Sequence, residues 1–284
     1  MPDKFVVTAN SFTSGYNRKT GNLVTFNHRG DELIQDGLQV NFWRAPTDND
    51  FGNNMQKRLK IWKQAGLNRV VTKDSVVKVS DYESKIIFNF SLPDVESTYC
   101  SEYTVYGNGE VEVTNSFVLG KKDLPELPRF GMRLTLPAAY DNMQWFGRGP
   151  FENYWDRNTA AFVGLYQGKV IDQFVPYVRP QENGNKTDIR WVTFTNSKGK
   201  GLKFIGTQLL SVGALPYAME DMDPGEKKLG IHPADLEPNN RVNVTIDYLQ
   251  MGVGGDTSWG ALPYDRYRLF PKEYAYSFRI RPVE

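Results

Sequence analysis

The chain has 284 residues, of which 40% are hydrophobic and 24% are charged, an ordinary balance for a folded globular protein. Its 34 basic and 33 acidic residues nearly cancel, which argues against nucleic acid or an anionic membrane as a partner. The single cysteine, Cys100, excludes an internal disulfide framework. Aromatic residues make up 13%, and such a surplus of rings is common around ligand-binding clefts.

No stretch has the pattern of a signal peptide, and no apolar run is long enough to span a bilayer. We therefore expect a soluble chain, in the cytoplasm or the periplasm. The first ten residues, "MPDKFVVTAN", enter a strand pattern directly after Met1. For that reason we also expect that upstream sequence is missing.

The first predicted element with a clear period is a helix in "NNMQKRLKIWKQAG", residues 53–66. Met55, Leu59 and Trp62 recur there at helical spacing, and Gly66 suits the C-terminal end. Asn53 or Asn54 can cap the start. The pattern predicts one short helix near residues 54–65, lying as a flap on sheets.

Most of the remaining chain has the pattern of β-strands. "EYTVYGNGEVEVTNSFVL", residues 102–119, alternates on both sides of Asn108-Gly109, a favoured dipeptide for a tight hairpin turn. "RVNVTIDYLQM" places Val242 and alternate residues through Tyr248 on one face and its polar residues, including Asp247, on the other. Further strands are predicted in "SKIIFNFSL", "GLKFIGTQLL" and "AYSFRIRPV".

Short strands separated by turns, without alternating long helices, predict an all-β sandwich or barrel. No internal repeat or low-complexity linker interrupts the chain, so we treat residues 1–284 as a single domain. Charges and prolines in "GKKDLPELPRFG" make residues 120–131 the best candidate for a boundary, but they do not justify dividing the chain there.

The motifs that usually carry catalysis or bind metals are missing. His28 and His232 belong to no metal-binding motif, no GxSxG nucleophile motif occurs, and Cys100 lacks the context of an activated thiol. The glycines of "GVGGD", residues 252–256, lack the spacing of a dinucleotide loop and are expected to form a turn. We assign no catalytic residue and no metal ligand to this chain.

Residues 44–52, "RAPTDNDFG", resemble the start of a calcium loop because Asp48 and Asp50 flank Asn49. However, Gly52 stands one position too early, and Leu59 occupies the place of the required bidentate glutamate. The two aspartates are therefore expected to cap backbone turns.

Residues 145–157, "WFGRGPFENYWDR", combine five aromatic and four charged side chains with Gly147, Gly149 and Pro150. This composition fits neither a helix nor a strand pattern. The charged residues could satisfy one another and neighbouring carbonyl groups. They are Arg148, Glu152, Asp156 and Arg157.

Five motifs occur in a fixed order along the chain: "NFWRAPTDNDFG", "DLPELPRFGMRL", "WFGRGPFENYWDR", "PYVRPQENGNKTDIRW" and "MGVGGDTSWG". Together they resemble the C-terminal domain, or small-chain region, of glycoside hydrolase family 2 β-galactosidases, from about Gly21 to the last strand. The resemblance implies a galactose-mutarotase-like supersandwich of two large antiparallel sheets packed face to face.

The resemblance also implies that residues 145–157 form a rigid loop. It further implies a network of interface or structural residues, comprising Arg44, Asp48 and Asp50 together with the four charged residues of 145–157. This network would either pack the domain against a catalytic barrel or stabilise only its own domain. Trp155 and Phe151 depart from the family pattern, which has a frequent proline and a more polar residue at these places.

Trp259 is the residue that the resemblance marks as a direct substrate contact. An indole ring can cover the apolar C–H face of a pyranose while the sugar hydroxyls remain free for hydrogen bonds. Without the resemblance, a role as a core or interface anchor would be favoured. Candidate residues for further loops at the mouth of the site are Gly52, Asn53, Asp256 and Ser258.

In the family that the chain resembles, both catalytic glutamates and the magnesium ligands lie in a preceding TIM barrel, which is absent from these 284 residues. We therefore expect no hydrolysis by this chain alone, no cofactor of its own, and magnesium in the barrel of the intact enzyme. The expected partners are that barrel, on the same or a second polypeptide, and a β-galactoside. A face left uncovered without the barrel would also favour a homo-oligomer.

Two other functions stay open. An aldose 1-epimerase-like enzyme needs a carboxylate base and a histidine acid, for which His232 and Glu237 are candidates by residue type alone. A free-standing carbohydrate-binding module would instead hold a glycan with exposed aromatic rings and carry out no chemistry.

Overall fold

The structure is a computed structural model that describes residues 3–9, 11–120, 123–228, 230–257 and 259–284. A small antiparallel sheet comes first in the chain. Its strands are β1 (Lys4–Ala9), β2 (Phe12–Asn17), β3 (Leu23–His28) and β4 (Asp31–Glu32).

All other described strands form one large sheet whose paired strands are antiparallel throughout. They are β5 (Asp36–Asn41), β6 (Val70–Ser80), β7 (Glu83–Leu92), β8 (Ser97–Tyr106), β9 (Val111–Val118), β10 (Arg129–Pro137), β11 (Asn142–Gly149), β12 (Phe162–Lys169), β13 (Lys186–Thr195), β14 (Gly201–Leu215), β15 (Arg241–Gln250) and β16 (Tyr274–Val283).

The large sheet branches at β14. The first half of β14 pairs with β16, which continues the sheet through β9, β8 and β7 to β6. Its second half pairs with β15, which leads through β10 to β5. On its other side β14 pairs with β13, followed by β11 and β12.

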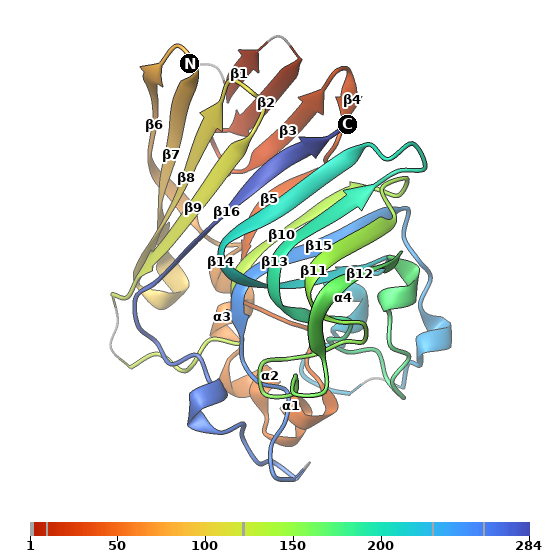
Figure 1. Cartoon of the computed structure of the whole chain (residues 1–284). Coiled ribbons are helices and arrows are strands. Elements are labelled where there is room, and N and C mark those ends of the chain that lie inside the picture. The colour runs from red at the N-terminus through yellow and green to blue at the C-terminus, as the bar shows by residue number, and fades with distance from the viewer. Residues whose placement is uncertain (1–2, 10, 121–122, 229, 258) are drawn as a thin grey trace.

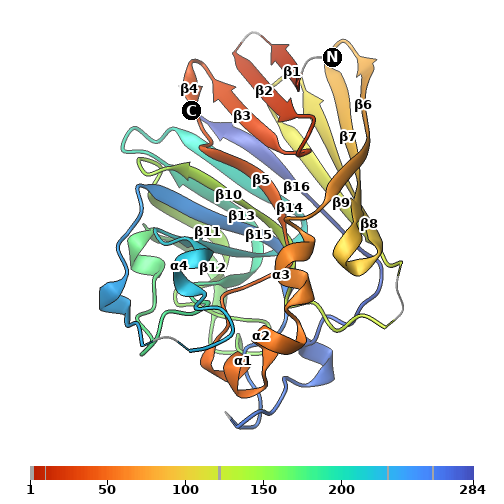
Figure 2. The same ribbon diagram turned by 180° about the vertical axis from the view of Figure 1, so that it is seen from behind.

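This branching produces two layers. Figure 1 shows β6–β9, β16, β14, β13, β11 and β12 in front, and Figure 2 shows β1–β3, β5, β10 and β15 on the opposite side. The small sheet closely approaches β5, because a Cβ atom at Gly37 would lie 1.7 Å from the Leu23 carbonyl oxygen. The expected all-β fold of antiparallel sheets is confirmed. In place of two large separate sheets, the structure has one large branched sheet that contributes strands to both layers, and a small sheet beside it.

The two layers enclose an aromatic core around Phe130. Its ring is fully buried, and ring centroids of five aromatic neighbours lie 5.3–6.4 Å away. These neighbours are Phe42, Tyr99, Phe117, Tyr274 and Tyr276. They come from both branches of the large sheet, so Phe130 helps hold the layers together.

The predicted hairpin is confirmed, with β8 and β9 joined at Asn108-Gly109 and Gly109 at a positive φ of 84°. Val242, Val244 and Ile246 also alternate into the core as expected. Asp247 is the exception: its placement on an outward polar face is wrong, since the side chain is completely buried. A register shift between Phe130 and Gly131 on the paired strand β10 accompanies this departure from strict alternation.

The expected single helix near 54–65 is interrupted. The structure has α2 (Met55–Arg58) and α3 (Ile61–Ala65), preceded by α1 (Asp48–Gly52), while a fourth short helix, α4 (Met219–Met222), lies elsewhere. Leu59 N–H bonds four residues back to Met55, but Trp62 N–H bonds only three back, to Leu59. The chain thus tightens between α2 and α3, where Trp62 is buried and its Nε1 donates to the Pro125 carbonyl.

Short 3₁₀ turns complete the secondary structure at Pro93–Val95, Ile171–Gln173, Pro233–Asp235 and Asp265–Tyr267. Within the described ranges, every helix is too short or too polar to cross a membrane.

Residues 145–157 are only partly a loop. Trp145–Gly149 form the end of β11, which pairs with both β12 and β13, so the expectation that they would not fit a strand is wrong. A Cβ atom at Gly147 would lie 2.9 Å from Ile189 Cα, which shows how closely β11 and β13 approach. The loop begins after the cis peptide bond between Gly149 and Pro150.

Truncating the central ring should reveal how much the core depends on it. We expect Phe130→Ala to lower the free energy of unfolding by about 3–5 kcal/mol, because it removes buried contacts and leaves a cavity. Phe162→Ala is the matched control, since this ring is 76% exposed, and we expect a change within about 0.5 kcal/mol. Equal losses in chemical denaturation of the two variants would contradict the central place of Phe130.

Candidate functional site

Arg44 lies at the centre of a buried polar network below the sheets. Its guanidinium forms two hydrogen bonds with Asp50, at 2.8 and 3.0 Å. Both side chains are buried, with at most 2% of their surface exposed. The same group donates to the carbonyl oxygens of Met251 and Gly252. One arginine therefore joins the segment before α1 to the segment after β15, residues 251–260, which we call the glycine-rich segment.

The α1 helix is fixed by a reciprocal cap. The Thr47 hydroxyl accepts from the Asp50 backbone N–H, and the Asp50 carboxylate accepts from the Thr47 N–H. The expected capping role is therefore confirmed for Asp50. It is wrong for Asp48, whose carboxylate binds side chains and accepts from no backbone N–H of the described residues. Asp48 lies at the surface, where Lys228 forms an ion pair with it at 2.7 Å and Gln181 donates to it. These contacts lower the pKa of Asp48, against the opposing effect of its partial burial.

The 145–157 segment reaches the same glycine-rich segment through Asp156. Its carboxylate accepts a hydrogen bond from the Gly254 N–H at 2.8 Å. A Cβ atom at Gly252 would lie 2.6 Å from the same carboxylate oxygen, so a larger residue would collide with it. Asp156 and Arg44 thus hold the segment from two sides, and Asn49 Nδ2 adds a bond to the Val253 carbonyl.

The four charged residues of 145–157 have three kinds of partner: one another, neighbouring carbonyl groups, and groups of other segments. Glu152 and Arg157 do form an ion pair, at 2.5 Å, and Glu152 also accepts the Gly184 N–H. Arg148 instead pairs with Asp188 at 2.6 Å and donates to the carbonyl oxygens of Asn158 and Ala161. The prediction that these residues satisfy one another and neighbouring carbonyl groups is confirmed for the pair Glu152 and Arg157, and for Arg148 through the two carbonyl oxygens. Asp156 instead binds the backbone of the glycine-rich segment.

Trp259 projects from the end of the glycine-rich segment. Its side chain is 91% exposed, which excludes a role as a core anchor of this chain. The following Gly260 has a φ of 112°, and a Cβ atom there would lie 3.1 Å from the Gly52 carbonyl oxygen. The two predicted mouth loops therefore meet at Gly52 and Gly260.

The remaining predicted mouth residues are Asp256, Asn53 and Ser258. Asp256 precedes Trp259 by three residues and accepts a hydrogen bond from the Tyr264 hydroxyl at 2.9 Å. Asn53 is nearly buried, and its carbonyl and side-chain oxygens both accept from Arg58. Ser258 lies outside the described residues.

A second buried cluster of titratable side chains, missed in the sequence, lies beside the first. Arg129 is completely buried between Glu182, at 2.9 Å, and Asp247, at 3.2 Å. Gln250 connects the clusters, since it donates to Glu182 and accepts from Arg44. Arg129 and Glu182 belong to sequence motifs described above. Asp247 lies in an alternating strand pattern that gave no indication of its burial.

All five sequence motifs thus contribute to one connected polar network. Within the described residues, no group of three or more His, Cys, Asp or Glu side chains could hold a metal ion. Through Arg44 and Asp156 the network binds the backbone of the segment that bears Trp259.

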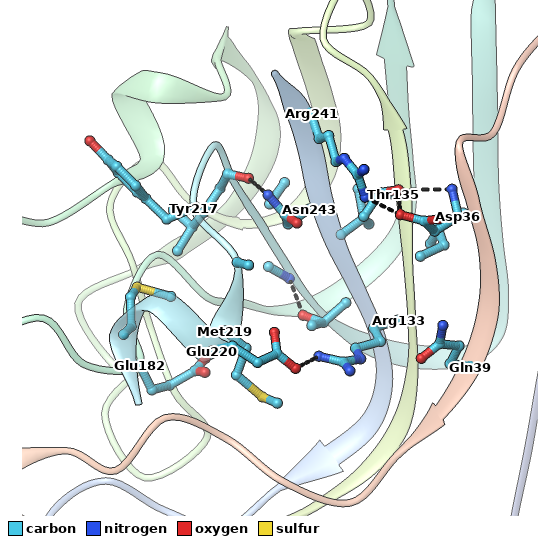
Figure 3. Close-up of a pocket in the computed structure, with 18 of the residues that line it drawn as sticks. Asp36, Gln39, Arg133, Thr135, Glu182, Tyr217, Met219, Glu220, Arg241 and Asn243 are labelled. Carbon is cyan, nitrogen blue, oxygen red and sulfur yellow. Dashed lines mark hydrogen bonds and ion pairs between the residues drawn. The ribbon is translucent and has the colours of Figure 1, made fainter. Parts of the chain in front are cut away.

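A separate cavity of about 310 Å³ opens between β5, β10, β14, β15 and the segment of α4 (Figure 3). Glu182 and Arg129 reach its wall from the buried cluster. The candidate epimerase residues do not meet there: neither His232 nor Glu237 lines this cavity, and both are exposed.

Comparison with solved structures places the fold in the galactose mutarotase-like class. A galactose mutarotase related enzyme from Lactobacillus acidophilus superposes with a TM-score of 0.53 at 9% identity, covering 99% of this chain and 97% of that chain. A putative aldose 1-epimerase from Escherichia coli K12 gives 0.51 at 10% identity, covering 98% of each chain.

Sequence relatives define the family more closely. Residues 8–280 match the family described as "Beta galactosidase small chain". A β-galactosidase of Priestia megaterium is 39% identical over 281 residues, which cover 98% of this chain and 26% of that protein. One of Halalkalibacterium halodurans is 32% identical, covering 91% of this chain and 25% of that protein. The chain belongs to the β-galactosidase small-chain family, and it spans about a quarter of the length of these relatives.

The Arg44–Asp50 pair can be tested by removing one partner. We expect Arg44→Met to lower the free energy of unfolding by about 3–5 kcal/mol, because the Asp50 carboxylate would stay buried without its cation. The double variant Arg44→Met/Asp50→Asn should recover part of this loss, since the buried charge is gone. Urea denaturation measures both, and a single variant within about 0.5 kcal/mol of the parent would contradict the prediction.

The second cluster predicts a specific pH dependence. Burial raises the pKa of Asp247 from 3.8 to about 8; Arg129 opposes this increase and Glu182 adds to it. The folded chain therefore retains a proton on Asp247 that the unfolded chain releases, so this contribution to stability is complete below about pH 4 and disappears as the pH rises through about 8.

Asp247→Asn removes this titration. Between about pH 5 and about pH 8, the free energy of unfolding should decline in both proteins, but less in the variant. The difference between the two declines should be on the order of 2–4 kcal/mol. Asp81→Asn, at an exposed turn, is the control and should decline as the parent does. Identical pH profiles for the parent and Asp247→Asn would show that Asp247 does not cause the decline.

Proposed function

We propose that this chain is the C-terminal part of a glycoside hydrolase family 2 β-galactosidase and completes the substrate site of a catalytic TIM barrel. Trp259 is the observation that carries the proposal. Its indole ring is exposed, yet the segment that bears it is held by Arg44 and Asp156. An aromatic ring left uncovered on an anchored segment suits a ligand contact better than a packing role.

The ring would serve as one wall of a sugar site. It can cover the C–H face of a galactose unit, while the barrel supplies the two carboxylates of a retaining glycosidase and binds the magnesium of the intact enzyme. Asp256 and the turn at Gly52 and Gly260 would form the edge of this wall. The chain alone is proposed to hydrolyse nothing.

An exposed apolar surface on β11 and β12 would contact the barrel. Phe146 and Leu165 are directly paired across these strands, and Val163 lies two residues from Leu165 on the same face. All three side chains are exposed. They adjoin Arg148, so the 145–157 segment would contribute to an interface as well as to its own domain, and this surface would favour self-association when the barrel is absent.

We further propose that residues 1–284 form a single domain. One continuous apolar cluster includes Phe12 of the small sheet, Phe88 and Ile246 of the large sheet, and Leu127 from the candidate boundary segment. A linker between independent domains would leave such residues exposed.

Complementation is the direct test. The Priestia megaterium relative, truncated to lack the quarter that this chain matches, would be mixed with this chain and assayed with a chromogenic β-galactoside. We expect neither part to be active alone and activity to appear on mixing. Trp259→Ala should lower kcat/KM of the mixture about 10- to 100-fold through lost contact with the sugar, and Trp259→Phe should retain part of the activity.

The control is Tyr82→Ala, which removes another exposed aromatic ring and should leave the mixture fully active. Activity in the chain alone would refute the proposal. Interconversion of galactose anomers by the chain would favour the epimerase-like alternative, and sugar binding that required Trp259 without the barrel would favour a carbohydrate-binding module.

A further inference from the structure

The cavity beside α4 has a balanced set of charges. Three arginines and three acidic residues line it, and they occur in pairs across its walls. Arg133 pairs with Glu220 at 2.5 Å, and Arg129 pairs with Glu182 at 2.9 Å. The third pair joins Arg241 to Asp36, as Figure 3 shows. Each charge is already compensated, so the cavity offers no net attraction to an ionic ligand.

Polar groups without a partner remain in the same walls. Gln39 lines the cavity from β5, and no hydrogen bond of its amide to the described residues is found. The Asn243 amide nitrogen donates to Leu215 and Asn239, whereas its Oδ1 accepts from none of the described residues. These amide groups can exchange hydrogen bonds with a neutral ligand that has several hydroxyl groups.

The remaining lining includes apolar side chains from the segment of α4. Ala218 and Met219 can cover C–H groups of a ligand, whereas the side chains of Leu134 and Val244 are buried in the core behind the cavity wall. The only aromatic residue of the described lining, Tyr217, packs on Phe174 with ring centroids 4.7 Å apart. The cavity therefore lacks a free ring on which a nucleobase could stack, and a saturated polyol suits it better.

We propose that this cavity binds a neutral carbohydrate of one or two sugar units. Its volume of about 310 Å³ lies at the lower end of the usual range for ligand sites. Neither Trp259 nor the glycine-rich segment lines it, so it is a second site, separate from the wall proposed for the barrel. It lacks a histidine among its described residues, and we assign it binding without catalysis.

Sugar binding to the isolated chain tests this proposal by calorimetry or saturation-transfer NMR. Galactose and lactose are the neutral probes, with galacturonate and galactosamine as charged probes of similar shape. We expect saturable binding of a neutral sugar with a dissociation constant of about 1 mM, and much weaker binding of both charged sugars.

Variants at Gln39 locate the site. Gln39→Trp should abolish binding by filling the cavity, and Gln39→Ala should weaken it about 2- to 10-fold through loss of hydrogen bonds. Gln35→Ala removes an exposed glutamine outside the cavity and should bind as the parent does. Trp259→Ala should also bind normally, which separates this site from the proposed barrel-completing wall.

Three results would overturn the proposal. They are absence of saturable binding up to about 50 mM of either neutral sugar, binding that persists unchanged in both Gln39 variants, and binding lost in Trp259→Ala. Equal affinity for the charged sugars would refute the inference from charge balance. Failure of complementation with the truncated relative would leave this cavity proposal standing, because the two sites share no residue.

Discussion

The ion pair between Arg44 and Asp50 is the interaction on which the candidate functional site depends. A guanidinium removed from water is stable only when its charge and its donors are satisfied. Here Asp50 supplies the charge, and the carbonyl oxygens of Met251 and Gly252 accept further bonds. The cost of burying Arg44 is thus offset only while the glycine-rich segment stays in place, which fixes the base of the loop that carries Trp259.

The parts of the fold that follow from local pattern could be predicted from the sequence. The hairpin at Asn108-Gly109 needs only a turn dipeptide between alternating strands, and both are visible within twenty or so residues. Asp247 could not be placed, because its burial depends on Arg129 and Glu182, which are distant in sequence. The interruption of the helix before Trp62 likewise depends on a distant partner, because the Trp62 ring is buried and donates to the Pro125 carbonyl.

The candidate site shows the same division. The spacing of the aspartates drew attention to Asp50, and the resemblance to β-galactosidases marked Arg44 and Trp259, but only the fold reveals which partners these residues meet. Arg148 illustrates the limit, since its partner Asp188 lies 40 residues away on a neighbouring strand rather than within its own segment. Several charged residues in one motif indicate a polar network, but which of them pair with each other depends on the register of the strands.

The Trp259 ring is open to solvent, and the loop that bears it is held by Arg44 and Asp156; this combination is the basis of the proposal that Trp259 forms one wall of a shared sugar site. The most direct measurement is oxidation of Trp259 by N-bromosuccinimide, mapped by peptide mass spectrometry, with barrel fragment and galactose added separately and together. We expect rapid oxidation in the chain alone and strong protection only when both are present. Full protection by the barrel fragment alone would make Trp259 an interface anchor, and full protection by galactose alone would make it a free-standing sugar site; either result would contradict a wall shared with the barrel.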